Sequence, residues 1–436
     1  MDLDRRELLA TAGALALGGL AGARPALALP GATAQTAPHR VIDLGLAATL
    51  RPGSPHDLRV GANRALLAET GTEWVRLWAD WPSLQPDPAL APDDPASPGR
   101  PWLQALDEQI ELACRDGVAV LLVAHRFPLW ATGLEALAPL RDTDAEIGFA
   151  PADRTTRERW ERYLAGGRDP SRARPSRRAL EERAPPEGCG PGSAWARFFA
   201  FLYARYHLGQ RASGRFASAF ELVNEPNLQL WPQRGPSPTD DPFEPGELVA
   251  HRVVAGMQVS ARAIAAAHGP ATLLLAPSAA DTDLTGRTAT PFDEFALALL
   301  DELDRRGHRA LATEGWAHHN YLDVEERGER RLQRLRAVLD GRWGGVQGEG
   351  GPSVFVTEGG ARLRRMRALY PQEDPLLAQA ECLRRAPRAG MAMLAQYTTY
   401  ADPRFDCGLL GPWPEGRRRP AVDAWTALGT PVPSAP

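Results

Sequence analysis

The stretch that decides the fold is VAVLLVA, which runs from Val118 to Ala124. All of its residues are apolar, and a strand of this kind is buried on both faces, as in a parallel sheet covered by helices. Similar short apolar runs lie on both sides of it in the chain, separated by helical patterns. Parallel strands need such crossovers because they all run in one direction. The stretch therefore predicts an α/β fold.

Outward from this strand, the chain alternates regularly between strand-like and helical segments. Strands are expected at 41–46, 74–78, 118–124, 220–223, 272–276, 310–317, 353–357 and 391–396. Helices are expected at 57–70, 102–115, 195–208, 247–267, 292–303, 331–339, 374–386 and 421–428. Eight of each predicts a (β/α)8 TIM barrel. A doubly wound open sheet would also alternate, but no GxGxxG turn follows the first strand.

The alternation of strand-like and helical segments is interrupted at residues 128–191, which are rich in charged residues, proline and glycine. We interpret this segment as a long insertion after strand three, and residues 86–101 as a smaller one after strand two. Long loops of this kind are usually functional or disordered. Both insertions follow strand ends, where barrel enzymes carry their active sites. The sequence predicts one (β/α)8 catalytic domain over residues 40–430, with the 128–191 insertion beside its site.

The amino-acid composition excludes some classes of function. The chain has 436 residues, 44% of them hydrophobic, and a net charge of -4. This is enough apolar material for a large core, and the charge balance argues against a nucleic-acid-binding protein. All 50 basic residues are arginine. Enzymes that form a Schiff base on lysine, such as lysine-dependent aldolases and pyridoxal enzymes, are therefore excluded.

The N-terminus has the pattern of an export signal. Arg5 and Arg6 precede an apolar run over 8–23, and small residues follow up to Ala28. We expect residues 1–28 to be a cleaved signal of the twin-arginine type, followed by a flexible lead at 29–39. Three acidic residues near the start dilute the positive charge, so an ordinary signal or a membrane anchor remains open. No later stretch is apolar enough to span a bilayer, which predicts a secreted or periplasmic protein without membrane contact after cleavage.

Four widely spaced cysteines form no metal-binding motif. They are Cys114, Cys189, Cys382 and Cys407, and no CxxC or Cys/His spacing links them. One or two disulfides are permitted in an oxidising compartment, although Cys114 falls in a helical pattern and suits a core position. The connectivity stays open.

Two glutamates end predicted strands. The segment FELVNEPN places Glu225 after strand four, and VFVTEG places Glu358 after strand seven. Strand ends of a barrel point into one mouth, so the two carboxyl groups can face each other. Glycoside hydrolysis needs such a pair, one carboxyl group to protonate the leaving oxygen and the other to attack the sugar. Alternatively, each glutamate only accepts hydrogen bonds at the start of a helix.

These motifs resemble the clan A glycoside hydrolases. The stretch ELVNEPNLQLW, from Glu221 to Trp231, is most similar to family 39, with family 5 second. The resemblance covers most of the chain. It implies a retaining mechanism with Glu225 as acid/base, Glu358 as nucleophile and Asn224 bound to the sugar 2-hydroxyl.

Further segments add to this resemblance. Arg76 in WVRLW matches an arginine that positions the nucleophile in family 5. WAHHNY at 316–321 resembles the histidine–tyrosine segment of strand six in the clan. CGLL at 407–410, followed by RPA at 419–421, resembles the segment that closes the barrel in the clan. The chain departs where it has Gln396 and Tyr397 in place of a tryptophan after strand eight, and where Gly359 and Gly360 follow the nucleophile. These departures concern the substrate more than the reaction.

Other residues are weaker candidates for substrate binding. They are His125, His319, Tyr321, Trp231 and Tyr397. His318 and His319 are adjacent on a strand and point to opposite faces, so we expect only one to reach the pocket. Tyr321 could hydrogen-bond the nucleophile. Among the tryptophans, five fall near strand ends and could stack on sugars or simply pack: Trp78, Trp81, Trp130, Trp231 and Trp413.

The sequence thus predicts a secreted retaining glycoside hydrolase that acts on an oligosaccharide, polysaccharide or glycoside. We expect no cofactor, and no metal, because no carboxylate lies at a ligand-like spacing from the histidines. A transglycosylase with the same residues is one alternative. A non-catalytic carbohydrate-binding barrel is another, which the intact pair of glutamates disfavours. The sugar, the linkage, exo or endo action and the oligomeric state stay open.

Overall fold

The computed structural model describes most of the chain after its N-terminal segment. The described residues are 38–45, 53–132, 185–230, 233, 247–268, 272–284, 289–308, 315–347, 353–388, 390–402 and 405–428. They belong to one compact unit, Gln35–Pro436. The expected export signal, residues 133–184 of the insertion and Trp231 lie outside the described residues.

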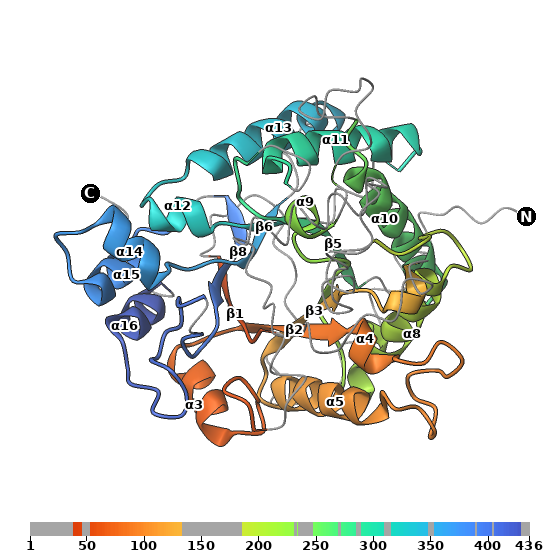
Figure 1. Cartoon of the computed structure of the whole chain (residues 1–436), viewed down its shortest axis with the longest axis horizontal. Helices are drawn as coiled ribbons and strands as arrows, with labels where there is room; N and C mark the ends of the chain where they lie inside the picture. Colours follow the sequence, from red (N-terminus) through yellow and green to blue (C-terminus); the bar gives the residue numbers. More distant parts are fainter. Residues whose placement is uncertain are drawn as a thin grey trace, which may run out of the picture. The chain divides into compact units, whose positions relative to one another are not determined.

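Eight parallel strands form a closed barrel, the predicted (β/α)8 TIM barrel fold (Figure 1). Each strand pairs with the next, and β1 closes the ring against β8. The strands are β1 (His39–Asp43), β2 (Trp74–Asp80), β3 (Ala119–His125), β4 (Ala219–Glu221), β5 (Leu273–Ala279), β6 (Trp316–His319), β7 (Val354–Glu358) and β8 (Met391–Tyr397).

A helix follows each strand and returns the chain along the outside of the barrel (Figure 1). These are α3 (Gly61–Glu69), α5 (Arg100–Arg115), α8 (Ala194–Tyr206), α10 (Ala250–Ala267), α11 (Phe292–Arg305), α13 (Arg330–Gln347), α15 (Pro375–Arg384) and α16 (Pro420–Ala427). Short helical segments follow several strands: α4 (Trp81–Leu84), η1 (Leu129–Ala131), α9 (Pro226–Gln229), α12 (Tyr321–Glu325) and α14 (Leu363–Leu369). One more, η4 (Leu208–Ser213), follows α8.

The hydrophobic pattern explains this arrangement. In β3, the four residues from Val120 to Val123 are fully buried, as expected for a strand with side chains packed on both faces. Helix α5 buries Leu103, Leu106 and Ile110, which recur at helical spacing and face the barrel. The segments thus bury their apolar residues in one continuous core between the strands and the helices.

Most strands begin or end within a few residues of the prediction. The first lies at His39–Asp43, where 41–46 was expected, and residue 46 lies outside the described residues. The sixth is described at Trp316–His319, and residues 310–314 of its expected range lie outside the described residues. Gly315, directly before β6, has a φ of +147°, and a Cβ atom there would lie 2.6 Å from the ring of Phe355. Only glycine fits both this approach and this backbone conformation, and β6 begins at the next residue.

The register between neighbouring strands determines which side chains lie together at the carboxyl end of the barrel. Asp43 on β1 is level with Arg76 on β2 and with Tyr397 on β8. Because all strands are parallel, their carboxyl ends open at the same end of the barrel. Residues from several distant parts of the sequence therefore meet there.

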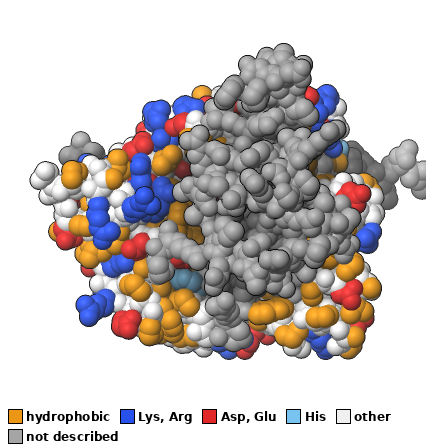
Figure 2. All heavy atoms as spheres, viewed as in Figure 1, with side chains coloured by type: hydrophobic (Ala, Val, Ile, Leu, Met, Phe, Trp, Pro, Cys, Tyr) orange, Lys and Arg blue, Asp and Glu red, His pale blue; other side chains and the backbone are white. Residues whose placement is uncertain are grey.

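All four cysteines are free thiols, so the disulfides that the sequence permitted are not formed. Of the helices described, none has both the length and the apolarity to cross a membrane. On the face seen in Figure 2, charged side chains of both signs are mixed with hydrophobic ones, and arginines are frequent where α12, α13 and α14 lie.

Candidate active site

The segment after β4 holds Glu225 in a constrained conformation. Asn224 forms a single parallel bridge to Ser278, and Glu225 then adopts the left-handed region, with φ +41° and ψ +53°. A non-glycine residue rarely adopts this conformation, which is concentrated at functional sites. The side chain of Asn227 fixes the next turn through hydrogen bonds with the backbone of Ala280, at 2.9 Å both ways, and of Thr290. The loop is thus pinned on both sides of Glu225.

Glu358 ends β7 and has a donor on each carboxylate oxygen. The Nη1 atom of Arg76 lies 2.5 Å from its Oε1, and the hydroxyl of Tyr321 donates to its Oε2 at 3.0 Å. Tyr321 begins helix α12, directly after β6, so three strands contribute to this arrangement. The two hydrogen bonds fix the orientation of the carboxyl group.

Arg76 lies at the centre of a buried ionic network. All five of its N–H groups donate: to Asp43 and Glu358 from Nη1, twice to Glu221, and to Asn224 from Nη2 at 2.7 Å. The carboxylates hold the pKa of Arg76 well above its usual value, although burial acts in the opposite direction. One guanidinium therefore positions the ends of β1, β4 and β7 together.

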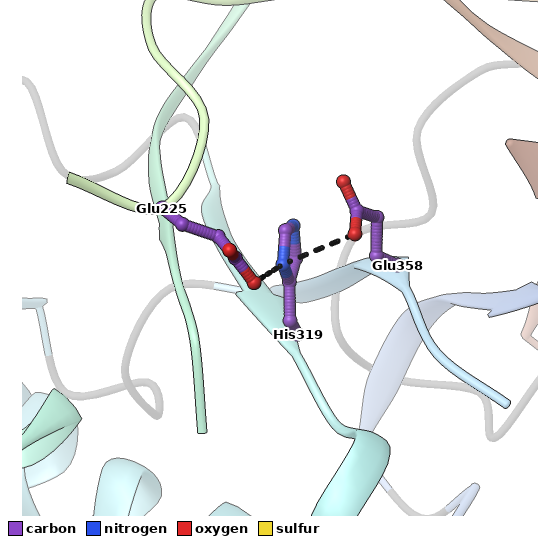
Figure 3. A group of neighbouring side chains, drawn as sticks. All are labelled: Glu225, His319 and Glu358. Atoms are coloured by element: carbon purple, nitrogen blue, oxygen red, sulfur yellow. Dashed lines mark hydrogen bonds and ion pairs between the residues drawn. The ribbon is translucent and has the colours of Figure 1, made fainter. Parts of the chain in front are cut away.

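His319 lies between the two glutamates (Figure 3). Its Nδ1 atom is 2.8 Å from Oε1 of Glu225 and 3.5 Å from Oε2 of Glu358. The neighbouring His318 points away and packs against the ring of Phe292 on α11. Burial lowers the pKa of His318 to about 3, so it stays neutral. As expected from strand geometry, only one of the two histidines reaches the site.

Burial and charge set the protonation of the site. Burial raises the pKa of Glu358 to about 7, and His319 and Arg76 oppose this rise. The pKa of His319 is raised because the attraction of both glutamates outweighs its burial. Burial and the nearby charge of Glu358 raise the pKa of Tyr321, which keeps it a hydrogen-bond donor. The site therefore holds a proton near neutral pH.

Two of the other expected site residues, His125 and Tyr397, lie beside the network around Arg76. His125 ends β3, where its ring packs edge-on against Trp78 with centroids 4.5 Å apart, and burial holds its pKa well below the usual value. Tyr397 lies level with Asp43, and its ring contacts Tyr321 edge-on. Both border the network around Arg76. Trp231 falls outside the described residues.

The remaining tryptophans divide between the core and the surface. Trp81 is buried and stacked on Phe198 of α8, so it is a core residue. Trp130 packs edge-on against Trp81 with centroids 5.4 Å apart. Trp413 is 36% exposed and contacts Tyr400 in the closing segment. Trp78 donates from Nε1 to Asp43 at 2.9 Å and supports the network rather than presenting an open face.

Three site residues were missed by the sequence analysis. Asp43 and Glu221 bind Arg76 from within β1 and β4, and Gln229 donates to Oε2 of Glu225 at 3.3 Å. The first two carry a sequence signal, since an acidic residue in an otherwise apolar strand needs a buried partner. The role of Gln229 follows only from the α9 turn, which brings it one turn beyond Glu225.

One expectation about metal ligands needs correction. Spacing along the chain showed no carboxylate near the histidines, yet Glu225, His319 and Glu358 place three ligand-type atoms within 4.8 Å of one another. The three come from different strands, so their juxtaposition is invisible in the sequence. The group could hold a cation, although both oxygens of Glu358 already accept hydrogen bonds, from Arg76 and from Tyr321.

Fold and site together define a (β/α)8 barrel with a facing pair of glutamates at the carboxyl end of its strands. Comparison with protein-family models and with curated proteins finds no match. Among solved structures, a GH5_18 protein from Streptomyces cattleya in complex with GlcNAc is 15% identical, with 92% of this chain and 83% of that chain covered and a TM-score of 0.50. A GH5_18 variant from Bifidobacterium longum in complex with Manβ1-4GlcNAc is 12% identical, with 92% and 79% covered and a TM-score of 0.50.

These similarities show the fold. Both are GH5_18 proteins, and what they share with this chain is the (β/α)8 barrel fold. The order of preference between families, with 39 ahead of 5, finds no specific support.

Proposed function

We propose that this protein is a retaining glycoside hydrolase with Glu225 as acid/base and Glu358 as nucleophile. The observation that carries the proposal is the facing pair itself, whose nearest oxygens lie within 4.8 Å. Retaining enzymes need carboxyl groups roughly 5–5.5 Å apart, whereas inverting enzymes need about 6.5–9.5 Å to admit a water molecule. The short separation therefore favours retention.

In the first step, protonated Glu225 gives its proton to the glycosidic oxygen while Oε2 or Oε1 of Glu358 attacks the anomeric carbon. The bond to the leaving alcohol breaks and a glycosyl ester forms on Glu358. In the second step, ionised Glu225 takes a proton from water, and the water oxygen attacks the same carbon. The ester breaks, and the sugar leaves with its original anomeric configuration.

The surrounding residues suit these roles. Arg76 and Tyr321 orient Glu358 and stabilise its carboxylate, both before attack and as it leaves the sugar. His319 and Gln229 contact opposite oxygens of Glu225 at 2.8 and 3.3 Å, which fixes the carboxyl group in either protonation state. The side-chain oxygen of Asn224 accepts from Arg76, and in this mechanism its amide nitrogen would donate to a sugar hydroxyl.

We propose a carbohydrate substrate and export from the cytoplasm. Both similar structures contain GlcNAc or a disaccharide of it, so Manβ1-4GlcNAc belongs in the first substrate panel, together with aryl glycosides and plant and microbial polysaccharides. A transglycosylase would use the same residues. It would be recognised by transfer products that exceed hydrolysis when an acceptor sugar is added.

Chemical rescue tests the roles of the two glutamates. Glu225→Ala should still form the glycosyl-enzyme from an aryl glycoside with a good leaving group, and then stall because no base activates water. Azide needs no base, so it should restore turnover and give a glycosyl azide of retained configuration. With Glu358→Ala, azide should attack directly and give the inverted azide. Product configuration is read by proton NMR.

A surface variant, Glu108→Ala, is the control, because Glu108 is an exposed residue of α5 that pairs with Arg59 and not with a residue of the candidate site. It should retain full activity. An inverted azide from Glu225→Ala and a retained azide from Glu358→Ala would show that Glu225 is the nucleophile and Glu358 the acid/base. Full activity in both glutamate variants would place the reaction elsewhere in the protein.

A further inference from the structure

The candidate active site carries an excess of negative charge. Asp43, Glu221 and Glu358 all bind Arg76, and Glu225 joins them through His319. When all four are ionised and His319 carries a proton, these carboxylates outnumber the two cationic groups, Arg76 and His319, by two charges. One of their oxygens, Oε1 of Glu221, is buried and accepts no hydrogen bond from any described residue. A buried excess of charge is costly unless protons or a cation compensate it.

Three ligand-type atoms, from Glu225, His319 and Glu358, converge beside this network (Figure 3). Nδ1 of His319 lies 2.8 Å from Glu225 and 3.5 Å from Glu358, and the three atoms lie within 4.8 Å of one another. A tetrahedral zinc ion with bonds of about 2.0–2.2 Å needs ligand atoms about 3.3–3.6 Å apart. Side-chain shifts of about an ångström would meet this condition.

The cluster is also accessible. The side chain of Glu225 is 18% exposed, whereas His319 is fully buried, so an ion can enter from the Glu225 side. Arg76 binds Oε1 of Glu358, which leaves Oε2 for the ion beside the hydroxyl of Tyr321. Three protein ligands and one open position are typical of a zinc site that keeps a water molecule.

We propose that Glu225, His319 and Glu358 bind one divalent transition-metal ion such as Zn²⁺, and that the ion acts as an inhibitor. An imidazole nitrogen with two carboxylate oxygens suits Zn²⁺ or Cu²⁺ better than Ca²⁺ or Mg²⁺, which take oxygen ligands. The bound ion occupies the lone pairs that the proposed reaction needs on both glutamates. The inhibitory part rests on the proposed function, whereas the binding does not.

Direct binding tests the site. Chelator-treated protein is titrated with Zn²⁺ by calorimetry and with Co²⁺ by visible absorption, which reports tetrahedral coordination. One ion should bind per chain. Removing even an outer-shell partner costs about 10–100-fold in metal affinity, so Glu225→Gln, Glu358→Gln and His319→Asn should each weaken binding at least about 10-fold.

His39→Ala is the matched control. Nδ1 of His39, at the start of β1, lies 3.3 Å from Glu73, and no described residue joins this pair as a third ligand, so the loss of His39 should leave binding unchanged. If His319→Asn does not fold, as judged by circular dichroism, the two isosteric glutamine variants decide. No saturable binding, or equal affinity in the glutamine variants and the wild type, would overturn the site.

Activity separates the two proposals. With an aryl glycoside that the protein cleaves, Zn²⁺ should reduce turnover and a chelator should restore it. Binding at the site with unchanged turnover would overturn the inhibitory part. Binding as expected in a protein that cleaves no glycoside would refute the proposed hydrolase and leave the metal site standing.

Discussion

Replacing Arg76 by methionine should expose how much of the site one guanidinium holds together. Methionine has a similar length but no donors, so Arg76→Met removes five buried hydrogen bonds and leaves three carboxylates without their cation. Breaking a buried ion pair by removing one partner costs about 3–5 kcal/mol. We expect the free energy of unfolding at pH 8 to fall by about this amount, measured by urea denaturation.

The loss should depend on pH in a defined direction. Without Arg76, the pKa of Glu358 rises further above its value in the unfolded chain, so the folded variant binds more protons than the unfolded one. Stability then falls as pH rises. The difference between variant and wild type should therefore be larger at pH 8 than at pH 5. Arg76→Lys, which keeps the charge but has fewer donors, should lose less.

Arg334→Met is the matched control. Arg334 also bonds two carboxylates, Asp283 and Asp293, but it is 36% exposed at the surface. Exposed pairs contribute about 0–1 kcal/mol, so its removal should change stability by less than about 1 kcal/mol. If Arg76→Met cost no more than this control, or cost the same at pH 5 and pH 8, the network would not have the role assigned to it.

Three further outcomes are expected. The nucleophile must be ionised, and burial raises the pKa of Glu358 to about 7, so kcat/KM should fall about tenfold per pH unit below that value; an acid limb near the ordinary glutamate pKa would contradict this. Glu225→Gly should be more stable than Glu225→Ala by about 0.5–1 kcal/mol in urea denaturation, because glycine tolerates the positive φ and alanine does not; equal stability would mean that the backbone relaxes. Protein recovered from the culture medium or periplasm should begin shortly after Ala28, and N-terminal sequencing that still finds Met1 would refute a cleaved signal.

Much of the barrel could be predicted because burial leaves a local pattern. The run Val120–Val123 is apolar on both faces, and α5 repeats apolar residues every third or fourth position. Such periods report the environment of each segment without reference to the rest of the chain. Strand ends were less certain where a special backbone decides, as at Gly315, whose approach to Phe355 cannot be seen in the sequence.

In the candidate site, too, the positions of residues along the chain could be predicted, whereas their contacts could not. The sequence by itself determined that Glu358, Arg76 and His319 lie in strands and that Glu225 follows one. In a parallel barrel, this places all four at the same end. Only the tertiary structure decided their contacts, because these depend on strand register and side-chain direction across several strands. It joined Asp43 to Arg76 at 2.5 Å, turned His319 inward between the glutamates, and brought ligand atoms from three strands within 4.8 Å. The period of the apolar residues determines which face of a strand or helix a residue lies on. Ion pairs and hydrogen bonds between strands depend instead on interatomic distances, which are set only when the barrel closes.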